Sequence, residues 1–321
     1  MCGIYGFCNI QDDGLLQRMA EKTVHRGPDA SGELRADRLT MGMRRLAIID
    51  LEEGDQPIYN EDRTLAVCYN GEIYNHVELR EQLEAAGHQF STDHSDTEVI
   101  IHGYEEWGTD CVKQFNGMFA FCIHDLRSGD SFFARDRCGQ KPFYYWSGSG
   151  GRFVFASEVK ALLQSADVPR RCNLDAIDPY LCLRVVPEPQ TMFDEIFTLP
   201  AAHHMVRKAD GEIQIERYWD IELKQDNDFP DDQEAIEMVE AQLRKSVNLV
   251  MRADVPVGAY LSAGIDSSLL VALMREQSDK VNTFSIGFNS PIDETAAAAE
   301  TAKLLDTNHH TINCAPEDFD L

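Results

Sequence analysis

The first half of the chain alternates short apolar runs with glycine, aspartate and asparagine, a pattern typical of many short β-strands. Two longer stretches repeat their apolar residues with helical spacing: residues 76–86, which follow Asn75, and residues 96–107, which follow Ser95. Asparagine favours the N-cap position, so we expect Asn75 to cap the first of these helices. Strands interspersed with helices predict sheets sandwiched between helical layers. The expected strands lie within residues 3–9, 39–51, 64–69, 117–125 and 143–146.

The second half of the chain changes character twice. Prolines cluster between residues 161 and 230, and no long repeat of apolar positions continues through them, so we expect this stretch to connect two domains. We therefore divide the chain into one domain at 2–160, a connecting segment at 161–230 and a second domain at 231–321. In the second domain the order of expected strands and helices predicts a parallel sheet. The expected elements are a helix over 231–252, a strand over 255–261, a glycine-containing turn over 262–268, a helix over 269–277, a strand over 281–288 and a helix over 293–305.

Composition and charge narrow the class of protein. A chain of 321 residues is longer than a domain with one ordinary hydrophobic core, which agrees with two domains. No apolar run approaches the length of a membrane span, and acids at Asp12 and Asp13 argue against a signal peptide. The nine cysteines lack metal-type spacing, so we expect reduced thiols and a cytoplasmic protein. A formal charge of −26 disfavours nucleic-acid binding, which requires lysine and arginine at the phosphates.

Cys2 directly follows the initiator methionine. Because the second residue is small, we expect Met1 to be removed, which leaves a cysteine with a free α-amine beside its thiol. An α-amine has an ordinary pKa of about 8 and a thiol one of about 8.5, so the amine can accept the thiol proton near neutral pH. Nucleophile and base then belong to one residue. The alternative is that Cys2 is only a small buried apolar residue.

Several short motifs follow Cys2 in a fixed order, and each is weak alone. They are RGPD at residues 26–29, RRLAI at 44–48, YNGEIYN at 69–75 and SDTE at 95–98. Together with MCGI at the start, they resemble the class II glutamine amidotransferase domain. The resemblance implies an α+β N-terminal nucleophile hydrolase fold, a four-layer αββα sandwich. A further segment, ARDRCGQKPFYY at 134–145, matches the asparagine-synthetase branch, and we assign it a mainly structural role.

The resemblance also implies how the charged groups of glutamine are held. Arg45 would clamp the α-carboxylate with a forked pair of charge-assisted hydrogen bonds, and the backbone around Ile48 would add to that grip. Asp96, with Glu72 nearby, would hold the α-ammonium group. Taken singly, Arg45 could equally form a surface ion pair, and Asp96 could be an acid at the start of its helix.

Two neighbouring residues would stabilise the charge that develops during attack. Thiolate attack on the glutamine amide creates a negative oxygen, and the Asn70 side chain and the Gly71 backbone N–H would form its oxyanion hole. Each such donor contributes about 3 kcal/mol to catalysis. Glycine suits this position because no side chain blocks a close approach. Asn-Gly is also a common hairpin turn, which is the structural alternative for this pair.

A second motif, SAGIDSS at residues 262–268, lies between an expected strand and an expected helix. Such a turn directs N–H groups and hydroxyls at an anion. It resembles the pyrophosphate loop of ATP-pyrophosphatases, which implies ATP as a substrate. By that resemblance Asp266 would reach a Mg²⁺ ion, and Leu261 and Ile286 would contact adenine through backbone atoms. The pyrophosphate would be held by Ser262, Gly264, Ser267 and Ser268.

The second domain departs from this family pattern in two ways. Ala263 stands where the family usually has glycine, which costs energy if the residue needs positive φ or if the backbone touches phosphate. The chain also stops at Leu321, soon after the second strand–helix unit. We therefore expect these 321 residues to make little or no asparagine, and we interpret the chain as a fragment of a longer protein or a truncated relative.

Taken together, the chain resembles the N-terminal portion of a glutamine-hydrolysing asparagine synthetase. The family reaction implies glutamine, aspartate and ATP as substrates, with ammonia passing from Cys2 to an aspartyl-adenylate, and a homodimer is possible. One alternative is a related amidotransferase that acts on another carboxylate in a biosynthetic pathway. Another is a truncated protein that only hydrolyses glutamine or only binds partners. We expect no nucleic acid and no membrane among its partners.

Overall fold

The computed structural model describes residues 1–223, 231–288 and 293–315. The chain forms two compact units, Met1–Leu223 and Lys224–Leu321, and each is described by itself. Within the described residues, no helix combines the length and apolar character that crossing a membrane requires.

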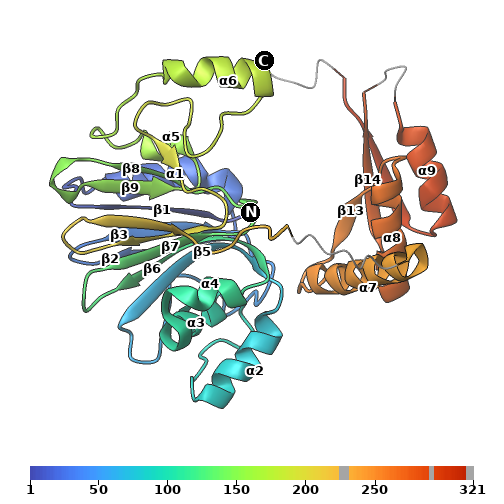
Figure 1. Cartoon of the computed structure of the whole chain (residues 1–321), viewed down its shortest axis with the longest axis horizontal. Coiled ribbons are helices and arrows are strands. Elements are labelled where there is room, and N and C mark those ends of the chain that lie inside the picture. The colour runs from blue at the N-terminus through green and yellow to red at the C-terminus, as the bar shows by residue number, and fades with distance from the viewer. Residues whose placement is uncertain (224–230, 289–292, 316–321) are drawn as a thin grey trace. The chain divides into compact units, whose positions relative to one another are not determined.

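Two antiparallel sheets of six strands each form the centre of the first unit (Figure 1). One sheet has the strand order β10-β8-β9-β1-β3-β2 and the other has the order β12-β11-β7-β6-β5-β4. The strands of the first sheet are β1 (Gly3–Cys8), β2 (Ala30–Arg35), β3 (Thr40–Arg45), β8 (Tyr144–Ser147), β9 (Phe153–Ala156) and β10 (Phe197–Thr198). Those of the second are β4 (Ile58–Tyr59), β5 (Leu65–Ile73), β6 (Gly117–Asp125), β7 (Ser131–Arg135), β11 (His203–Arg207) and β12 (Ile213–Arg217).

Helices cover the outer faces of both sheets in Figure 1. The first sheet packs on α1 (Leu15–Thr23) and α5 (Val159–Leu162), and the second packs on α2 (His76–Ala86), α3 (Glu98–Trp107) and α4 (Cys111–Gln114). A short helix, α6 (Ile177–Leu183), follows α5 along the chain. A third apolar cluster fills the space between the two sheets. The layer order is therefore αββα, which confirms the expected N-terminal nucleophile hydrolase architecture.

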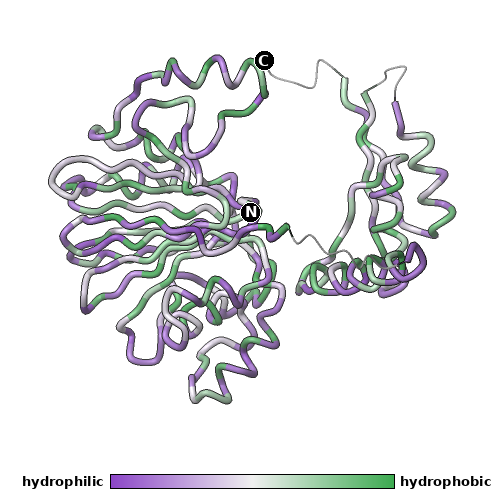
Figure 2. Tube along the Cα trace, viewed as in Figure 1, coloured by the Kyte–Doolittle hydropathy of each residue, from purple (hydrophilic) through white to green (hydrophobic). Residues whose placement is uncertain are grey.

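Strand alternation decides which residues face which layer. Along β5, Ala66 and Cys68 join the cluster between the sheets, whereas Val67 and Tyr69 join the cluster under the helices. Successive side chains of a strand point to opposite faces, so even-numbered positions of β5 face the partner sheet. Figure 2 shows hydrophobic colour along the strands and hydrophilic colour over many of the loops that join them.

Several elements differ from the expectations. The strand expected over 39–51 ends at Arg45, and residues 46–57 form a loop. Asn75 does not cap α2 with its side chain, because its amide bonds Asn116 N and Gln114 O instead. Helix α1 was not expected, although Leu15, Leu16, Met19 and Ala20 form one apolar face.

The segment 161–230, expected to connect the domains, is part of the first unit as far as Leu223. It supplies β10, β11 and β12 to the two sheets, and β11 pairs with both β7 and β12. Prolines exclude long helices here, but strands of two to five residues fit between them. The boundary placed after residue 230 adjoins residues 224–230, which lie outside the described residues.

The second unit contains a parallel sheet of three strands, β13 (Gly258–Tyr260), β14 (Asn282–Gly287) and β15 (Asn308–Asn313). Helix α7 (Asp232–Val250) precedes the sheet, and α8 (Ile265–Gln277) and α9 (Thr295–Leu304) connect its strands. Hydrophobic and hydrophilic residues alternate along α7 in Figure 2, as an amphipathic helix requires. The expected parallel sheet is confirmed, and β15 is a strand that the sequence pattern did not indicate.

Candidate active site

Cys2 lies immediately before β1 and packs against the cluster between the sheets. Its Sγ is 3.4 Å from Leu46 N and 3.6 Å from Leu46 O, and its carbonyl accepts a bond of 2.9 Å from Arg26 Nε. Burial raises the pKa of the Cys2 thiol, and the Leu46 N–H and the α-amine oppose that rise. In this structure the α-amine belongs to Met1, and burial lowers the pKa of that amine.

A narrow pocket surrounds the Cys2 thiol, and most of the residues expected to bind glutamine line it. Its walls come from the start of β1, the loop after β3, strand β5 and the segment before α3. The lining residues are Cys2, Arg45, Leu46, Ile48, Ile49, Gly54, Gln56, Tyr69, Gly71, Glu72, Asp96 and Thr97. The sequence motifs are thus brought together from four separate parts of the chain.

Asn70 sits beside this pocket with its amide unpaired. It occupies an even-numbered position of β5, so its side chain is on the same sheet face as the apolar cluster that contacts Cys2. The residue is only 1% exposed, and neither Nδ2 nor Oδ1 has a hydrogen-bond partner among the described residues. Most buried side-chain amides are satisfied, so an orphaned one is typical of a group reserved for a ligand.

The ladder between β5 and β6 fixes the direction of the Gly71 N–H. Tyr74 N donates to Asn116 O at 2.8 Å, so that pair is hydrogen-bonded. Bonded and non-bonded pairs alternate along an antiparallel ladder, and the pair Gly71–Phe119 is three steps away. Gly71 therefore directs its N–H away from β6.

The neighbouring N–H groups on this free edge already have partners. Tyr69 N donates to Gln56 Oε1 at 2.7 Å and Ile73 N donates to Asp96 Oδ2 at 2.9 Å. The Gly71 N–H lies between them and faces the pocket. A Cβ atom at Gly71 would meet Met118 O at 2.1 Å, so only glycine fits this position without displacing the backbone of β6.

Arg45 is a buried guanidinium held by the loop that follows β3. Its NH1 donates to Asp55 Oδ1 at 2.8 Å and to Leu51 O at 3.4 Å. Its NH2 donates to Ile49 O at 3.2 Å and to Asp50 O at 2.5 Å. The alternative of a simple surface ion pair does not hold, because the side chain of Arg45 is 5% exposed and orders the loop that lines the pocket.

Two carboxyls, that of the buried Asp96 and that of the half-buried Glu72, also line the pocket. Asp96 Oδ2 accepts from Tyr69 Oη and Ile73 N, both at 2.9 Å. Burial, and secondarily the nearby charge of Asp96, raises the pKa of Glu72 to about 8. Burial likewise raises the pKa of Asp96, against the lowering effect of its two hydrogen bonds. A cation between these carboxyls would favour their ionised forms.

Lys141 lies near the site, although the sequence predicts a mainly structural role for its segment. It is 4% exposed, and its Nζ lies 3.2 Å from the sulfur of Met1. Burial lowers the pKa of Lys141, whereas the charges of Glu72 and Cys2 raise it. Lys141 lies in the segment 134–145, which matches the asparagine-synthetase branch, but only the fold shows that its side chain reaches the start of the chain.

In the second unit, the serine-rich loop joins β13 to α8. The hydroxyls of Ser262 and Ser267 are 2.9 Å apart, and Gly264 N donates to Ser262 Oγ at 3.1 Å. Ser268 Oγ donates to Gly264 O at 2.8 Å. Ala263 is not among the residues with positive φ, so its methyl group causes no left-handed strain.

A cavity of about 310 Å³ adjoins that loop at one end of the parallel sheet. Four of the residues expected to bind ATP line it, namely Leu261, Ser262, Ser267 and Ile286. Gly264, Asp266 and Ser268 belong to the same loop and the first turn of α8, but they do not line this cavity. Asp266 is exposed.

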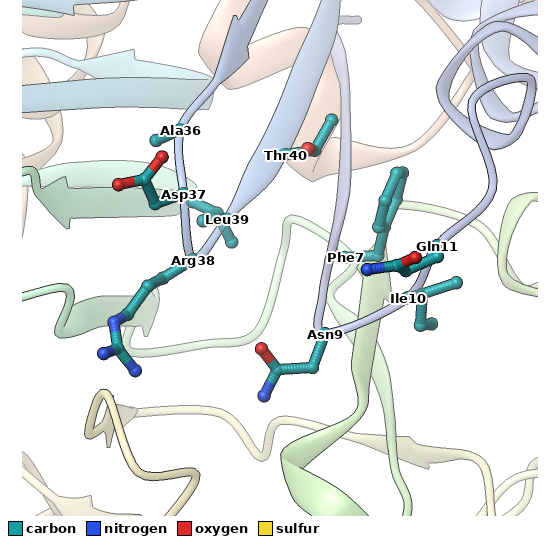
Figure 3. Close-up of a pocket in the computed structure, with 9 residues that line it drawn as sticks. All are labelled: Phe7, Asn9, Ile10, Gln11, Ala36, Asp37, Arg38, Leu39 and Thr40. Carbon is teal, nitrogen blue, oxygen red and sulfur yellow. The ribbon is translucent and has the colours of Figure 1, made fainter.

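Another cavity of about 310 Å³ lies in the first unit, at the far end of β1 from Cys2 (Figure 3). With a rise of about 3.3 Å per residue, seven residues of extended chain separate it from Cys2 by roughly 20 Å. It is lined by Phe7, Asn9, Ile10, Gln11, Ala36, Asp37, Arg38, Leu39 and Thr40, and none of the expected site residues contributes to it.

The αββα layers, with a cysteine at the head of a central strand, define the first unit as an N-terminal nucleophile hydrolase. Solved structures share this fold. A glutamine phosphoribosylpyrophosphate amidotransferase from Bacillus subtilis aligns with a TM-score of 0.50 and 16% identity, covering 97% of this chain and 65% of that one. An allosteric regulatory enzyme of purine biosynthesis aligns with a TM-score of 0.54 and 15% identity, covering 97% and 80%.

The family model for the glutamine amidotransferase domain matches residues 1–219, so the chain belongs to that family. The model described as asparagine synthase matches residues 238–320. Relatives include a putative glutamine-hydrolysing asparagine synthetase of Methanocaldococcus jannaschii, 37% identical over all of this chain and 66% of its own length. Asparagine synthetase 1 of B. subtilis is 36% identical over 99% of this chain and 51% of its own. The chain therefore spans about half to two thirds of the length of these relatives.

Proposed function

We propose that the first unit hydrolyses glutamine at Cys2, as the amidotransferase part of a glutamine-hydrolysing asparagine synthetase. With Met1 removed, the α-amine of Cys2 takes the thiol proton and the thiolate attacks the side-chain amide carbon. The carbon–nitrogen bond breaks, the nitrogen leaves as ammonia after receiving a proton, and a glutamyl thioester remains. Water then attacks the thioester, which releases glutamate and restores the thiol.

The observation that carries this proposal is the pair of unused donors beside Cys2. The orphaned Asn70 amide and the outward Gly71 N–H are available for a negative oxygen. Preorganised donors of this kind stabilise the transition state, because they need no reorganisation during the reaction. Arg45, after releasing some of the loop oxygens that its NH1 and NH2 contact in this structure, would hold the substrate carboxylate together with the Ile48 segment, and Asp96 with Glu72 would hold its ammonium group.

Two measurements on one preparation test the proposal. Intact mass should show that Met1 is absent, and the purified protein should release ammonia from glutamine. An electrophilic glutamine analogue, a diazo-oxo-norleucine, should label Cys2 in the wild type, and Cys2→Ala should remove both the label and the activity. Cys8→Ala is the matched control, because Cys8 is fully buried at the far end of β1. Undiminished ammonia release by Cys2→Ala would refute the proposal.

We infer further that the second unit binds ATP, and that the whole protein uses the nucleotide to activate aspartate for attack by ammonia, giving asparagine, AMP and pyrophosphate. The support is the segment 262–268, which forms the end of the loop after β13 and the first turn of α8, and the cavity beside it. The carboxylate of Asp266 is the kind of hard oxygen donor that Mg²⁺ prefers, so it could hold that ion together with phosphate oxygens. Mg²⁺ would neutralise phosphate charge. Equilibrium dialysis tests this inference: Ser262→Ala and Asp266→Asn should each weaken ATP binding, and unchanged affinity in both would contradict it.

A cytoplasmic location and a homodimer remain predictions for the whole protein. Neither follows from the contacts of this chain. Cell fractionation and analytical ultracentrifugation of the native protein would decide them.

A further inference from the structure

Two histidines and two glutamates converge on the helix-covered side of the second sheet, apart from the residues that line the Cys2 pocket. Glu61 lies between β4 and β5, His88 follows α2, and His102 and Glu105 lie on α3. One nitrogen or oxygen from each residue comes within 4.8 Å of the other three. These four residues, the His-Glu cluster, carry the mixture of imidazole and carboxylate donors that binds Zn²⁺ and similar ions.

The distances between the donor atoms suit a small ion. His102 Nδ1 is 2.9 Å from Glu105 Oε2 and 3.7 Å from Glu61 Oε2. His88 Nδ1 is 3.7 Å from Glu105 Oε2 and also 3.7 Å from Glu61 Oε1, the Glu61 oxygen that does not face His102. A tetrahedral Zn²⁺ with bonds of about 2.0–2.2 Å places its ligand atoms about 3.4 Å apart. Shifts of up to about 1 Å would therefore bring these atoms to coordination distance.

The opposite atom of three members has a hydrogen-bond partner, and the opposite nitrogen of His102 lies near a carboxylate without a hydrogen bond. His102 Nε2 lies 3.5 Å from the buried Glu98 carboxylate, and His88 Nε2 lies 3.3 Å from Glu106 Oε2. In addition, Gln89 N donates to Glu61 Oε1 at 2.9 Å and Asn60 Nδ2 donates to Glu105 Oε1 at 2.7 Å. Metal-binding histidines usually direct their other nitrogen to a carboxylate, which fixes the ring and leaves one nitrogen for the metal.

The surroundings of the cluster are acidic, which is compatible with a bound cation. Glu61, Glu98, Glu105 and Glu106 lie around it, and within the described part of the chain their ion pairs are all with His88 and His102. Two histidines supply at most two positive charges against four negative ones. A divalent ion with neutral imidazoles would carry the same two positive charges, so the ion would replace the two imidazole protons in an acidic environment that also favours a cation.

We propose that the His-Glu cluster binds one divalent transition-metal ion of the Zn²⁺ type in a structural site. Four protein ligands leave no open position, which is the arrangement of structural rather than catalytic zinc. The ion would link the turn at residues 60–64 and His88, which follows α2, to helix α3. Asp96, which lines the Cys2 pocket, lies two residues before the start of α3, so the metal would steady one wall of that pocket from outside.

The test uses the full chain without a histidine tag, stripped with a chelator and titrated with Co²⁺ and Zn²⁺. We expect one equivalent of Co²⁺ to produce the visible absorption of a tetrahedral site and one equivalent of Zn²⁺ to displace it. A Zn²⁺ concentration one hundred times the Kd should raise Tm by about 5–10 °C. This readout does not depend on glutaminase activity.

Isosteric variants distinguish the cluster from other metal-binding side chains. Glu105→Gln and His88→Gln should weaken Zn²⁺ binding at least about tenfold, since even outer contacts of metal ligands cost 10–100-fold. His310→Gln on β15 is the control and should bind like the wild type. Absence of a one-to-one Zn²⁺ complex, or equal affinity in Glu105→Gln and the wild type, would overturn the proposal.

Discussion

Asn70→Ala should separate the chemical step from the stability of the fold. In the structure the Asn70 amide is buried and neither of its polar atoms is paired, so it contributes no hydrogen bond that truncation could remove. A buried unpaired polar group costs about 1–3 kcal/mol, and its loss offsets the packing that the alanine gives up. We therefore expect the free energy of unfolding to change by less than about 1 kcal/mol.

The catalytic effect of the same substitution should be much larger. Removing one oxyanion donor lowers kcat by about 10²–10³, which corresponds to about 2.7–4 kcal/mol of transition-state stabilisation. KM should change little, because the donor acts on charge that develops only in the transition state. Steady-state ammonia release from glutamine gives kcat and KM, and urea unfolding followed by fluorescence gives the stability.

Asn75→Ala, five residues further along the chain, is the control for Asn70→Ala and should show the opposite behaviour. The Asn75 amide donates to Gln114 O at 3.0 Å and accepts from Asn116 N at 2.8 Å, so it is a paired, structural amide. We expect this variant to lose about 1–2 kcal/mol of stability with kcat unchanged. The reasoning about Asn70 fails if its alanine variant loses more than about 3 kcal/mol of stability while kcat stays within threefold of wild type.

Three further predictions concern the Cys2 pocket and the segment 262–268. Gly71→Ala should lose about 1–3 kcal/mol of stability in urea unfolding, because its Cβ would meet Met118 O at 2.1 Å; Gly103→Ala, whose nearest atoms are ring carbons at 3.3 Å, should lose less. Glu72→Gln should stabilise the protein more at pH 9 than at pH 5. The pKa of Glu72 is about 8 in the folded state, above its value in the unfolded chain, so the stability of the wild type falls as pH rises between about 4.5 and 8. Equal effects of the substitution at both pH values would contradict this. Ala263→Gly should tighten ATP binding in equilibrium dialysis by removing a methyl group beside phosphate, not by relieving backbone strain, and an unchanged Kd would argue against a phosphate role for the loop.

The apolar pattern predicted sheets covered by helices, whereas the four-layer αββα order and the residues around Cys2 were implied by the family resemblance that the short motifs carry. Apolar alternation marked the long central strands, and short motifs marked Arg45, Asn70, Gly71 and Asp96. Helix α1 also had a readable apolar face, and β12 had two alternating isoleucines, but the short strands β10 and β11 had no such pattern. Strands of two to five residues are specified by their long-range partners more than by their own composition.

Other features of the site depend on geometry that no motif encodes. The motif RRLAI placed Arg45 in the pocket, but it did not show that four loop contacts hold the guanidinium. The contact of Lys141 with Met1 joins residues 140 positions apart in the chain. The His-Glu cluster likewise draws on three separate segments, and its spacing resembles no local metal-binding motif.

If the proposed function is right, the half-buried carboxyl of Glu72 and the buried carboxyl of Asp96 couple substrate recognition to acidity. Below about pH 8 the pair retains a proton that isolated carboxyls would have lost. An ammonium group arriving beside them would expel that proton to the buffer, so glutamine affinity should increase between about pH 5 and pH 8. Calorimetric titrations in buffers of different ionisation enthalpy would then yield different apparent heats for one and the same binding event.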